Sequence, residues 1–225
     1  MFGARRARSI RTAPYVVALV LFALVVPGRA RADGTTSPIW ATAQAEELTR
    51  QGSAHAARGE VDIAARRFLQ AIEFDATYGP AYLALGRLHE SVGDPREGER
   101  AYSLGIEHIG GFAEGLLARA SLRSRQHRIP EAIADLAAAV EMRPDDLGVL
   151  QLLARAYISV NALPAALAVT RRIEALAESH HDTAASASAH VSARALARLV
   201  SEADPVSAGL TKRGTVRRML ALRAR

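Results

Sequence analysis

Residues 81–107 read AYLALGRLHESVGDPREGERAYSLGIE, and residues 48–75, one repeat earlier, read LTRQGSAHAARGEVDIAARRFLQAIEFD. When the two segments are aligned with a shift of 34 residues, small and bulky side chains fall at the same positions. The small side chains form two series, Gly52, Gly86, Ala120 and Ala154, and Ala64, Gly98, Ala132 and Ala166, and the bulky ones form the series Leu48, Tyr82, Leu116 and Leu150. Three series that keep one period without an insertion indicate an internal repeat.

A period of this length has a simple physical origin. Two antiparallel helices of about four turns each, joined by short turns, use about 34 residues. Small side chains are expected where paired helices approach closely, and bulky ones fill the spaces between pairs. Phe68, Tyr102 and Leu136 supply bulky side chains on the second helices, with Thr170 as a weaker fourth member. Because one pair cannot bury its apolar faces alone, the pairs are expected to stack.

The residues between the helices agree with this pattern. Gly59 and Gly93 fall at the ends of two first helices, where a left-handed backbone is needed, and His127 and Asn161 fall at the same place in later units. Asparagine tolerates that conformation and histidine tolerates it less well. Asp94 before Pro95 predicts a helix N-cap followed by a proline in the first turn. Pro130 and Pro164 are likewise expected to open second helices.

With these segments the chain resembles the tetratricopeptide repeat family. The third unit matches through Ala132, Leu136, Ala139 and Pro144, and the fourth through Ala154, Tyr157 and Ala166. The resemblance implies an all-α fold, a right-handed superhelical solenoid of about four helical hairpins. We place the hairpins at 45–78, 79–112, 113–146 and 147–180, after an N-terminal linker at 33–44. The period fades beyond this array, and the alanine-rich residues 181–204 are expected to form a capping helix.

The N-terminal residues 1–32 are typical of an export signal. They hold six arginines and no acidic residue, and their apolar run, residues 14–26, is shorter than the ~20 residues that a membrane-spanning helix needs. Ala30-Arg31-Ala32 offers a cleavage site before Asp33. We therefore expect a periplasmic or secreted protein with no membrane span after cleavage. The net charge of +6 resides in this leader, since the rest holds 23 basic and 23 acidic side chains, and nucleic acid is not an expected partner.

Composition and spacing argue against catalysis. The absence of cysteine excludes disulfides, thiolate zinc sites and cysteine nucleophiles. No glycine-rich phosphate loop or nucleophile with a paired base is recognisable, so neither an enzyme nor a cofactor is expected. The alternative is a metal site or metal-dependent enzyme near His180, His181 and His190, although adjacent histidines on a helix point in different directions.

Binding is the more strongly indicated function. The family resemblance implies that the first helix of each unit lines a concave groove for a protein or peptide. The residues predicted to contact a partner there are Arg50, Leu83, Arg87, Glu90, Leu117, Arg125, Gln151 and Arg155. Because guanidinium groups pair with carboxylates bidentately, an acidic segment is a suitable ligand. The alternative is a solvated face on which the arginines pair with Glu46, Glu90 and Glu114.

The C-terminal residues differ in charge from the array. Residues 181–225 hold eight basic and three acidic side chains, and no acid follows Lys212. The basic tail at 205–225 is compatible with an adaptor on an anionic membrane surface. A short frayed terminus is the simpler interpretation.

Overall fold

The computed structural model describes residues 38–203, and in this range it contains nine helices and no strand. The chain divides into two compact units, residues 1–41 and residues 42–225. The described part of the first unit is the beginning of α2. The helices are α2 (Pro38–Ala57), α3 (Val61–Phe74), α4 (Gly79–Ser91), α5 (Pro95–His108), α6 (Ala113–Arg125), α7 (Ile129–Met142), α8 (Leu147–Ser159), α9 (Leu163–Ser179) and α10 (Thr183–Ala203).

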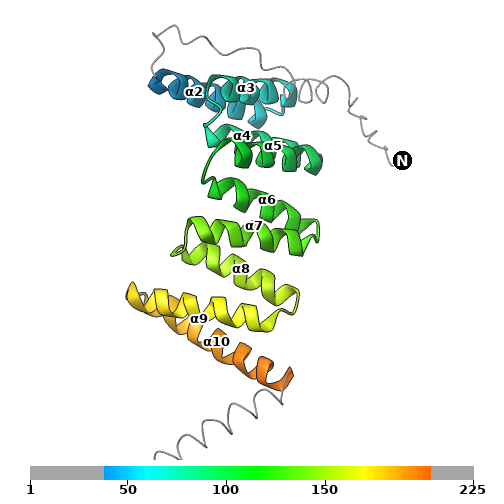
Figure 1. The fold of residues 1–225 in the computed structure, drawn as a ribbon. Coiled ribbons are helices and arrows are strands. Elements are labelled where there is room, and N and C mark those ends of the chain that lie inside the picture. The colour runs from blue at the N-terminus through cyan, green and yellow to red at the C-terminus, as the bar shows by residue number, and fades with distance from the viewer. Residues whose placement is uncertain (1–37, 204–225) are drawn as a thin grey trace, which may run out of the picture. The chain divides into compact units, whose positions relative to one another are not determined.

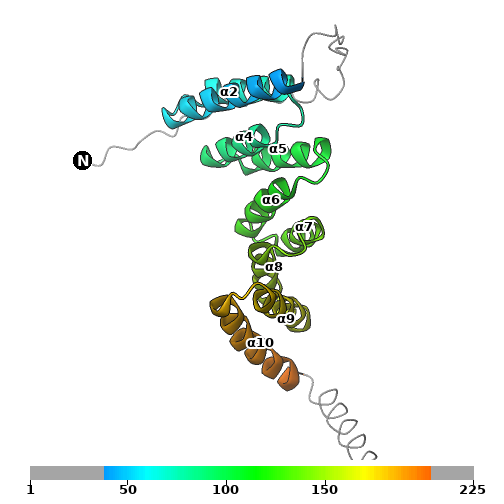
Figure 2. The ribbon, with the colours of Figure 1, turned by 90° about the vertical axis from the view of Figure 1, so that its left-hand side faces the viewer.

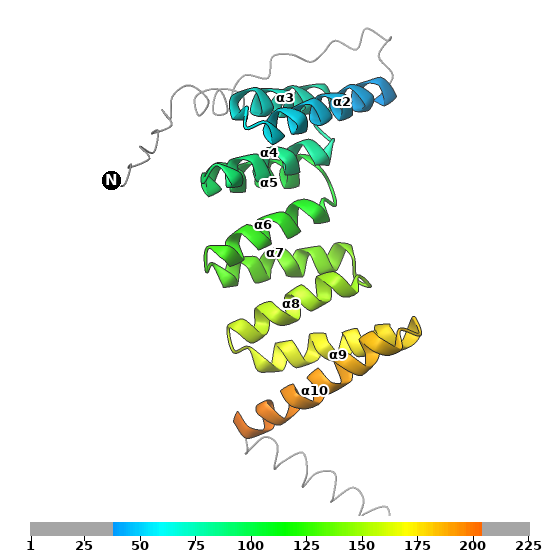
Figure 3. The same cartoon turned by 180° about the vertical axis from the view of Figure 1, so that it is seen from behind.

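Within the unit of residues 42–225, the helices α3 to α10 form an array in which each packs against the next along the chain (Figures 1 and 3), and α2 packs against α3 at Gly52. The second helices α3, α5, α7 and α9 begin at Val61, Pro95, Ile129 and Leu163, which are 34 residues apart. The first helices α4 and α6 also contact each other directly. In Figure 2, α5, α7 and α9 lie on one side of the row formed by α4, α6 and α8. The expectation of an all-α helical repeat fold is confirmed.

The core forms where the small residues of a first helix pack against the bulky residues of its second helix. Gly52 of α2 lies against the ring of Phe68 of α3, because a Cβ on this glycine would stand 2.5 Å from a ring carbon. Gly86 of α4 lies against the ring of Tyr102 of α5 in the same way. Phe68 and Tyr102 are almost completely buried. The repeat therefore pairs a small residue on each of these first helices with a ring on the second helix.

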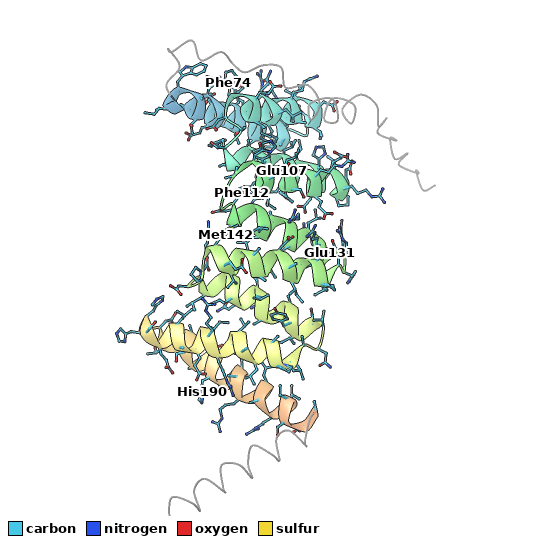
Figure 4. The ribbon with its side chains drawn as sticks, viewed as in Figure 1. Phe74, Glu107, Phe112, Glu131, Met142 and His190 are labelled. Carbon is cyan, nitrogen blue, oxygen red and sulfur yellow. The ribbon has the colours of Figure 1, made fainter. Side chains whose placement is uncertain are left out.

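A second contact joins neighbouring units. The ring of Phe112, labelled in Figure 4, is buried between α4, α5 and α6. Cβ atoms added to Gly79 and Gly105 would stand 2.6 and 2.8 Å from this ring, and Gly115 lies against it as well. Three glycines thus make room for one aromatic ring at the junction between the second and third hairpins.

The predicted left-handed turn positions are confirmed. Gly59 and Gly93 have φ angles of 75° and 81°, and His127 and Asn161 have φ angles of 61° and 57°. The Asp94 side chain caps α5 by accepting a hydrogen bond from the backbone N–H of Glu97 at 3.3 Å. Pro130 and Pro164 lie in the first turns of α7 and α9, where no helical hydrogen bond is lost.

The array differs from the expectation at its N-terminal end. The predicted linker of residues 33–44 is helical from Pro38 onward, because α2 begins there. A proline is tolerated in the first turn of a helix, and residues 39–44 contain neither glycine nor a further proline to stop one. The first of the first helices is therefore longer than α4, α6 and α8.

The C-terminal end carries an additional helix. α9 is 17 residues long where α5 and α7 have 14, and the turn that follows contains His181 with a φ angle of 57°. Asp182 then caps α10 by accepting a hydrogen bond from the backbone N–H of Ala185 at 2.9 Å. α10 packs against α9 and buries Ala189, Ala193 and Leu196. Among the described helices none combines the length and apolarity required to cross a bilayer.

Candidate binding surface on the first helices

All eight residues predicted to contact a partner lie on the first helices of the hairpins, with Arg50 on α2 and the other seven on α4, α6 and α8. The repeat places them at shared registers: Leu83, Leu117 and Gln151 occupy one, and Arg87, Ser121 and Arg155 occupy another. Every member of the second register is exposed, while Leu83 and Leu117 are half-buried. Because α4 contacts α6, residues at one register of these two helices are neighbours, and α8 continues the register one repeat later. We call Arg87, Ser121 and Arg155 the arginine row.

Two arginines of this row keep their guanidinium groups free. Among the described residues, neither Arg87 nor Arg155 makes an ion pair or a side-chain hydrogen bond. Burial raises the pKa of the Tyr102 hydroxyl, and the positive charge of Arg87 acts on this pKa in the opposite direction. For these two positions the alternative of arginines neutralised by neighbouring carboxylates is wrong.

Arg125 and Glu90, by contrast, bind each other. The Arg125 guanidinium of α6 forms an ion pair with Glu90 of α4. Glu90 also accepts a hydrogen bond of 2.6 Å from the Tyr102 hydroxyl, and Arg125 donates a long one of 3.3 Å to the Ser121 hydroxyl. For Arg125 the alternative of intramolecular pairing is therefore correct. The pair joins the first helices of two hairpins and leaves Arg125 less available to a partner.

The remaining charged positions are also paired within the array. Arg50 donates two hydrogen bonds to Glu47, at 2.8 and 2.7 Å, and this contact lowers the pKa of the Glu47 carboxyl to about 2. Glu114 pairs with Arg143, which holds the pKa of the Glu114 carboxyl below its usual range. Gln151 is exposed beside Arg155 on the same helix face. The residues free for a charged ligand are thus Arg87 and Arg155.

Sequence reasoning missed a charged network inside the array. Asp135 of α7 has only 4% of its surface exposed, and it accepts hydrogen bonds from both Arg119 and Arg123 of α6. Arg123 also donates to Glu99 of α5, at 2.8 Å, and Arg119 donates to the Ser103 hydroxyl of α5, at 2.9 Å. The network therefore links three consecutive helices. Its one signal in the sequence is an acidic residue, Asp135, inside the apolar pattern of a second helix.

Arg128 extends this network toward the turn between α6 and α7. It donates to both oxygens of Glu99 and to both oxygens of Glu131, at distances of 2.5–3.1 Å. The Arg128 guanidinium is the main cause that lowers the pKa of the Glu99 carboxyl. These arginines are saturated by acceptors, so they hold helices together rather than face a ligand.

The histidines proposed for a metal site do not converge. His180 caps the C-terminus of α9, His181 lies in the following turn, and His190 lies on α10, where Figure 4 labels it. His190 pairs with Glu174 of α9 at 2.5 Å. The described part of the chain contains no group of three histidine, aspartate or glutamate side chains arranged to hold a metal ion. The basic tail at 205–225 and the leader at 1–32 lie outside the described residues.

Comparisons with known proteins give matches among solved structures only. No protein-family model and no curated protein matches the sequence. The first tetratricopeptide (TPR) domain of Spaghetti (RPAP3), bound to the HSP90 peptide SRMEEVD, is similar over 53% of this chain and 95% of that chain, with 14% identity and a TM-score of 0.46. MamA is similar over 67% of this chain and 96% of that chain, with 15% identity and a TM-score of 0.46. The Arabidopsis OM64 TPR domain covers 47% and 88%, with 17% identity and a TM-score of 0.40.

Proposed function

Since the described helices form tetratricopeptide-type repeats, we propose that the chain is a non-catalytic scaffold or assembly factor that holds a protein or peptide against its first helices. Such a surface is preformed, because each hairpin packs against its neighbours in the chain without a partner. Binding then requires little ordering of the scaffold itself, which lowers its entropic cost.

The partner we propose is an acidic segment. The supporting observation is that Arg87 and Arg155 are exposed, free of ion pairs among the described residues, and two repeats apart at one register. An arginine without an intramolecular acceptor is ready to donate two parallel hydrogen bonds to a carboxylate. The Ser121 hydroxyl stands between the two arginines in the repeat and can donate a further hydrogen bond to a carboxylate or a backbone carbonyl.

Half-buried Leu83 and Leu117 complete the surface. They lie one helical turn before Arg87 and Ser121, so apolar side chains adjoin the charged row. A segment that alternates acidic and apolar side chains would satisfy both. Because exposed ion pairs contribute only about 0–1 kcal/mol each, such contacts give moderate affinity that weakens as the salt concentration rises.

The experiment is a titration of the purified chain with a fluorescein-labelled hexaglutamate peptide, followed by anisotropy at low ionic strength. The variant Arg87→Glu/Arg155→Glu is expected to weaken binding by at least about tenfold, which corresponds to about 1.4 kcal/mol. The matched control is Arg171→Glu/Arg198→Glu, which makes the same charge change at exposed positions of α9 and α10. Unchanged affinity in the first variant, or an equal loss in both, would refute the proposed surface.

We further propose that this scaffold works in the bacterial cell envelope, as a periplasmic or secreted protein. The support is the basic and apolar pattern of residues 1–32 with its Ala30-Arg31-Ala32 site. N-terminal sequencing of the protein recovered from a cell that exports it should begin at Asp33. Recovery of the protein in the cytoplasmic fraction with residues 1–32 still present would contradict this location.

A further inference from the structure

A row of glutamates runs along the second helices. Glu73 of α3, Glu107 of α5 and Glu141 of α7 are 34 residues apart, and all three are exposed in the last turn of their helices. Figure 4 labels Glu107 of this set. We call these three residues the glutamate row. It repeats one carboxylate per hairpin over three consecutive hairpins.

These carboxylates are not neutralised by their surroundings. Within residues 38–203, none of the three makes an ion pair or a side-chain hydrogen bond. His108, next to Glu107, instead stacks on Tyr82 and bonds to the Leu104 carbonyl, and Arg143, close to Glu141, pairs with Glu114. The exposed arginines Arg66 and Arg100 on the same helices lie seven residues, about two turns, before the glutamates.

The arginine row and the glutamate row have matching spacing. Arg87 and Arg155 are separated by two repeats, and so are Glu73 and Glu141. When the two rows face each other, both arginines meet a carboxylate in one register, with Ser121 opposite Glu107. A shift by one repeat places Ala175, the fourth position of the glutamate row, opposite an arginine and loses one of the two pairs. The repeat period itself therefore selects a register.

We propose that the arginine row of one copy of this chain docks on the glutamate row of a second copy. This inference rests on the proposed function, because it names a partner for the same two free arginines. The contact pairs charges of opposite sign that are unpaired in the isolated array, and it leaves the Glu90–Arg125 pair and the Asp135 network intact. Complementary charge rows also accelerate encounter and set the register of association.

The geometry of the contact predicts the kind of assembly. The two rows lie on different sets of helices, so the contact is heterologous, and of two bound copies one still presents a free glutamate row and the other a free arginine row. Heterologous contacts build open chains or rings rather than closed two-fold dimers. The average mass is therefore expected to grow with protein concentration beyond that of a dimer.

The test is light scattering of the purified chain over a series of concentrations at low and high salt. The wild-type chain is expected to associate at low ionic strength and to dissociate near 0.5 M salt, where charges separated by more than a few ångströms are screened. Two reversal variants, Arg87→Glu/Arg155→Glu and Glu73→Arg/Glu141→Arg, should each stay monomeric alone. An equimolar mixture of the two should associate again, because each reversed row then faces a row of opposite sign.

The control variant of the peptide experiment also serves for self-association. Arg171→Glu/Arg198→Glu should associate like the wild type, and Glu107→Gln should reduce association less than Glu73→Gln or Glu141→Gln. A closed dimer, a wild-type monomer at all concentrations, or a mixture that stays monomeric would overturn the proposal. Loss of association in only one reversal variant would overturn it too, since the other row would then serve a different surface.

Peptide binding and self-association can be tested separately with two variants. The variant Glu73→Gln/Glu141→Gln keeps both free arginines and adds no new cation, so it must still bind the hexaglutamate peptide if the arginine row recognises acidic segments. Peptide binding by this variant together with a monomeric wild type refutes self-association alone. Retained peptide binding by Arg87→Glu/Arg155→Glu refutes the proposed surface itself.

Discussion

Gly86 lies directly against the ring of Tyr102, so that a Cβ at this position would overlap the ring carbons. The contact joins the two helices of one hairpin, and the same contact recurs between Gly52 and Phe68 in the hairpin before it. It explains why glycine stands inside two helices, where it would otherwise lower stability. The small residues of the repeat thus mark the positions at which the two helices of a hairpin approach closely.

Replacing Gly86 with alanine should destabilise the chain by about 1–3 kcal/mol, because the ring must move in a packed core. The sign is diagnostic, since the same change in a free helix stabilises by about 1 kcal/mol. Urea unfolding followed by circular dichroism measures it. Gly110→Ala is the control, because nothing lies within 4 Å of a Cβ there. The double variant Gly86→Ala/Tyr102→Leu, which copies Ala120 and Leu136 of the next hairpin, should recover part of the loss.

A larger loss is expected at Asp135. Substitution by alanine leaves Arg119 and Arg123 without their shared buried acceptor, and an uncompensated charge of this kind costs about 3 kcal/mol. Glu131→Ala is the matched control, since its carboxylate is exposed and solvent screens its pair with Arg128. Equal unfolding midpoints for the two variants would show that the network does not hold α5, α6 and α7 together.

These two sites differ in how far the sequence predicts them. The spacing of glycine, alanine and aromatic residues every 34 positions predicts the hairpins, because helix packing depends on local size and period. The turns follow from single residues such as Gly93 and Asn161. In the sequence, Asp135 is a single acidic residue within an apolar segment. Its partners Arg123 and Arg119 lie 12 and 16 residues away on another helix, so only the packed structure reveals the contacts.

The candidate binding surface, too, is predicted only in part by the sequence. The repeat register places Arg87, Arg125 and Arg155 on first helices, but it does not tell which arginines are free. Glu90 and Arg125 are 35 residues apart, and they meet because α4 packs against α6 and the Tyr102 hydroxyl fixes the carboxylate. Pairing between helices depends on side-chain reach and helix separation, which periodicity leaves open.

His89 gives the chain a pH-dependent stability. Burial lowers the pKa of its imidazole, with Glu97 and Asp94 acting weakly in the opposite direction. The proton is therefore bound more tightly in the unfolded chain, whose histidines titrate near pH 6.5. Stability from the neutral imidazole is complete above that value and is lost as the pH falls through it toward the lower folded pKa.

The corresponding measurement is the unfolding free energy between pH 7.5 and pH 5.5, above the range in which the ion-paired carboxyls titrate. His89→Phe should flatten this dependence, while the exposed His180→Gln variant should retain the wild-type slope. Identical slopes in the wild type and His89→Phe would assign the dependence to other groups.

Substitutions at the left-handed turns should raise stability. His127 has a φ angle of 61° at the position where the two preceding hairpins carry glycine, and a Cβ is strained in that region. His127→Gly should therefore stabilise by up to about 1 kcal/mol, and Asn161→Gly by less, because asparagine adopts this conformation more readily. The reverse changes, Gly59→Ala and Gly93→Ala, should destabilise by about 1 kcal/mol although nothing lies within 4 Å of either Cβ. Thermal unfolding of the four variants ranks them, and a destabilised His127→Gly would mean that its side chain, rather than the backbone, determines the turn.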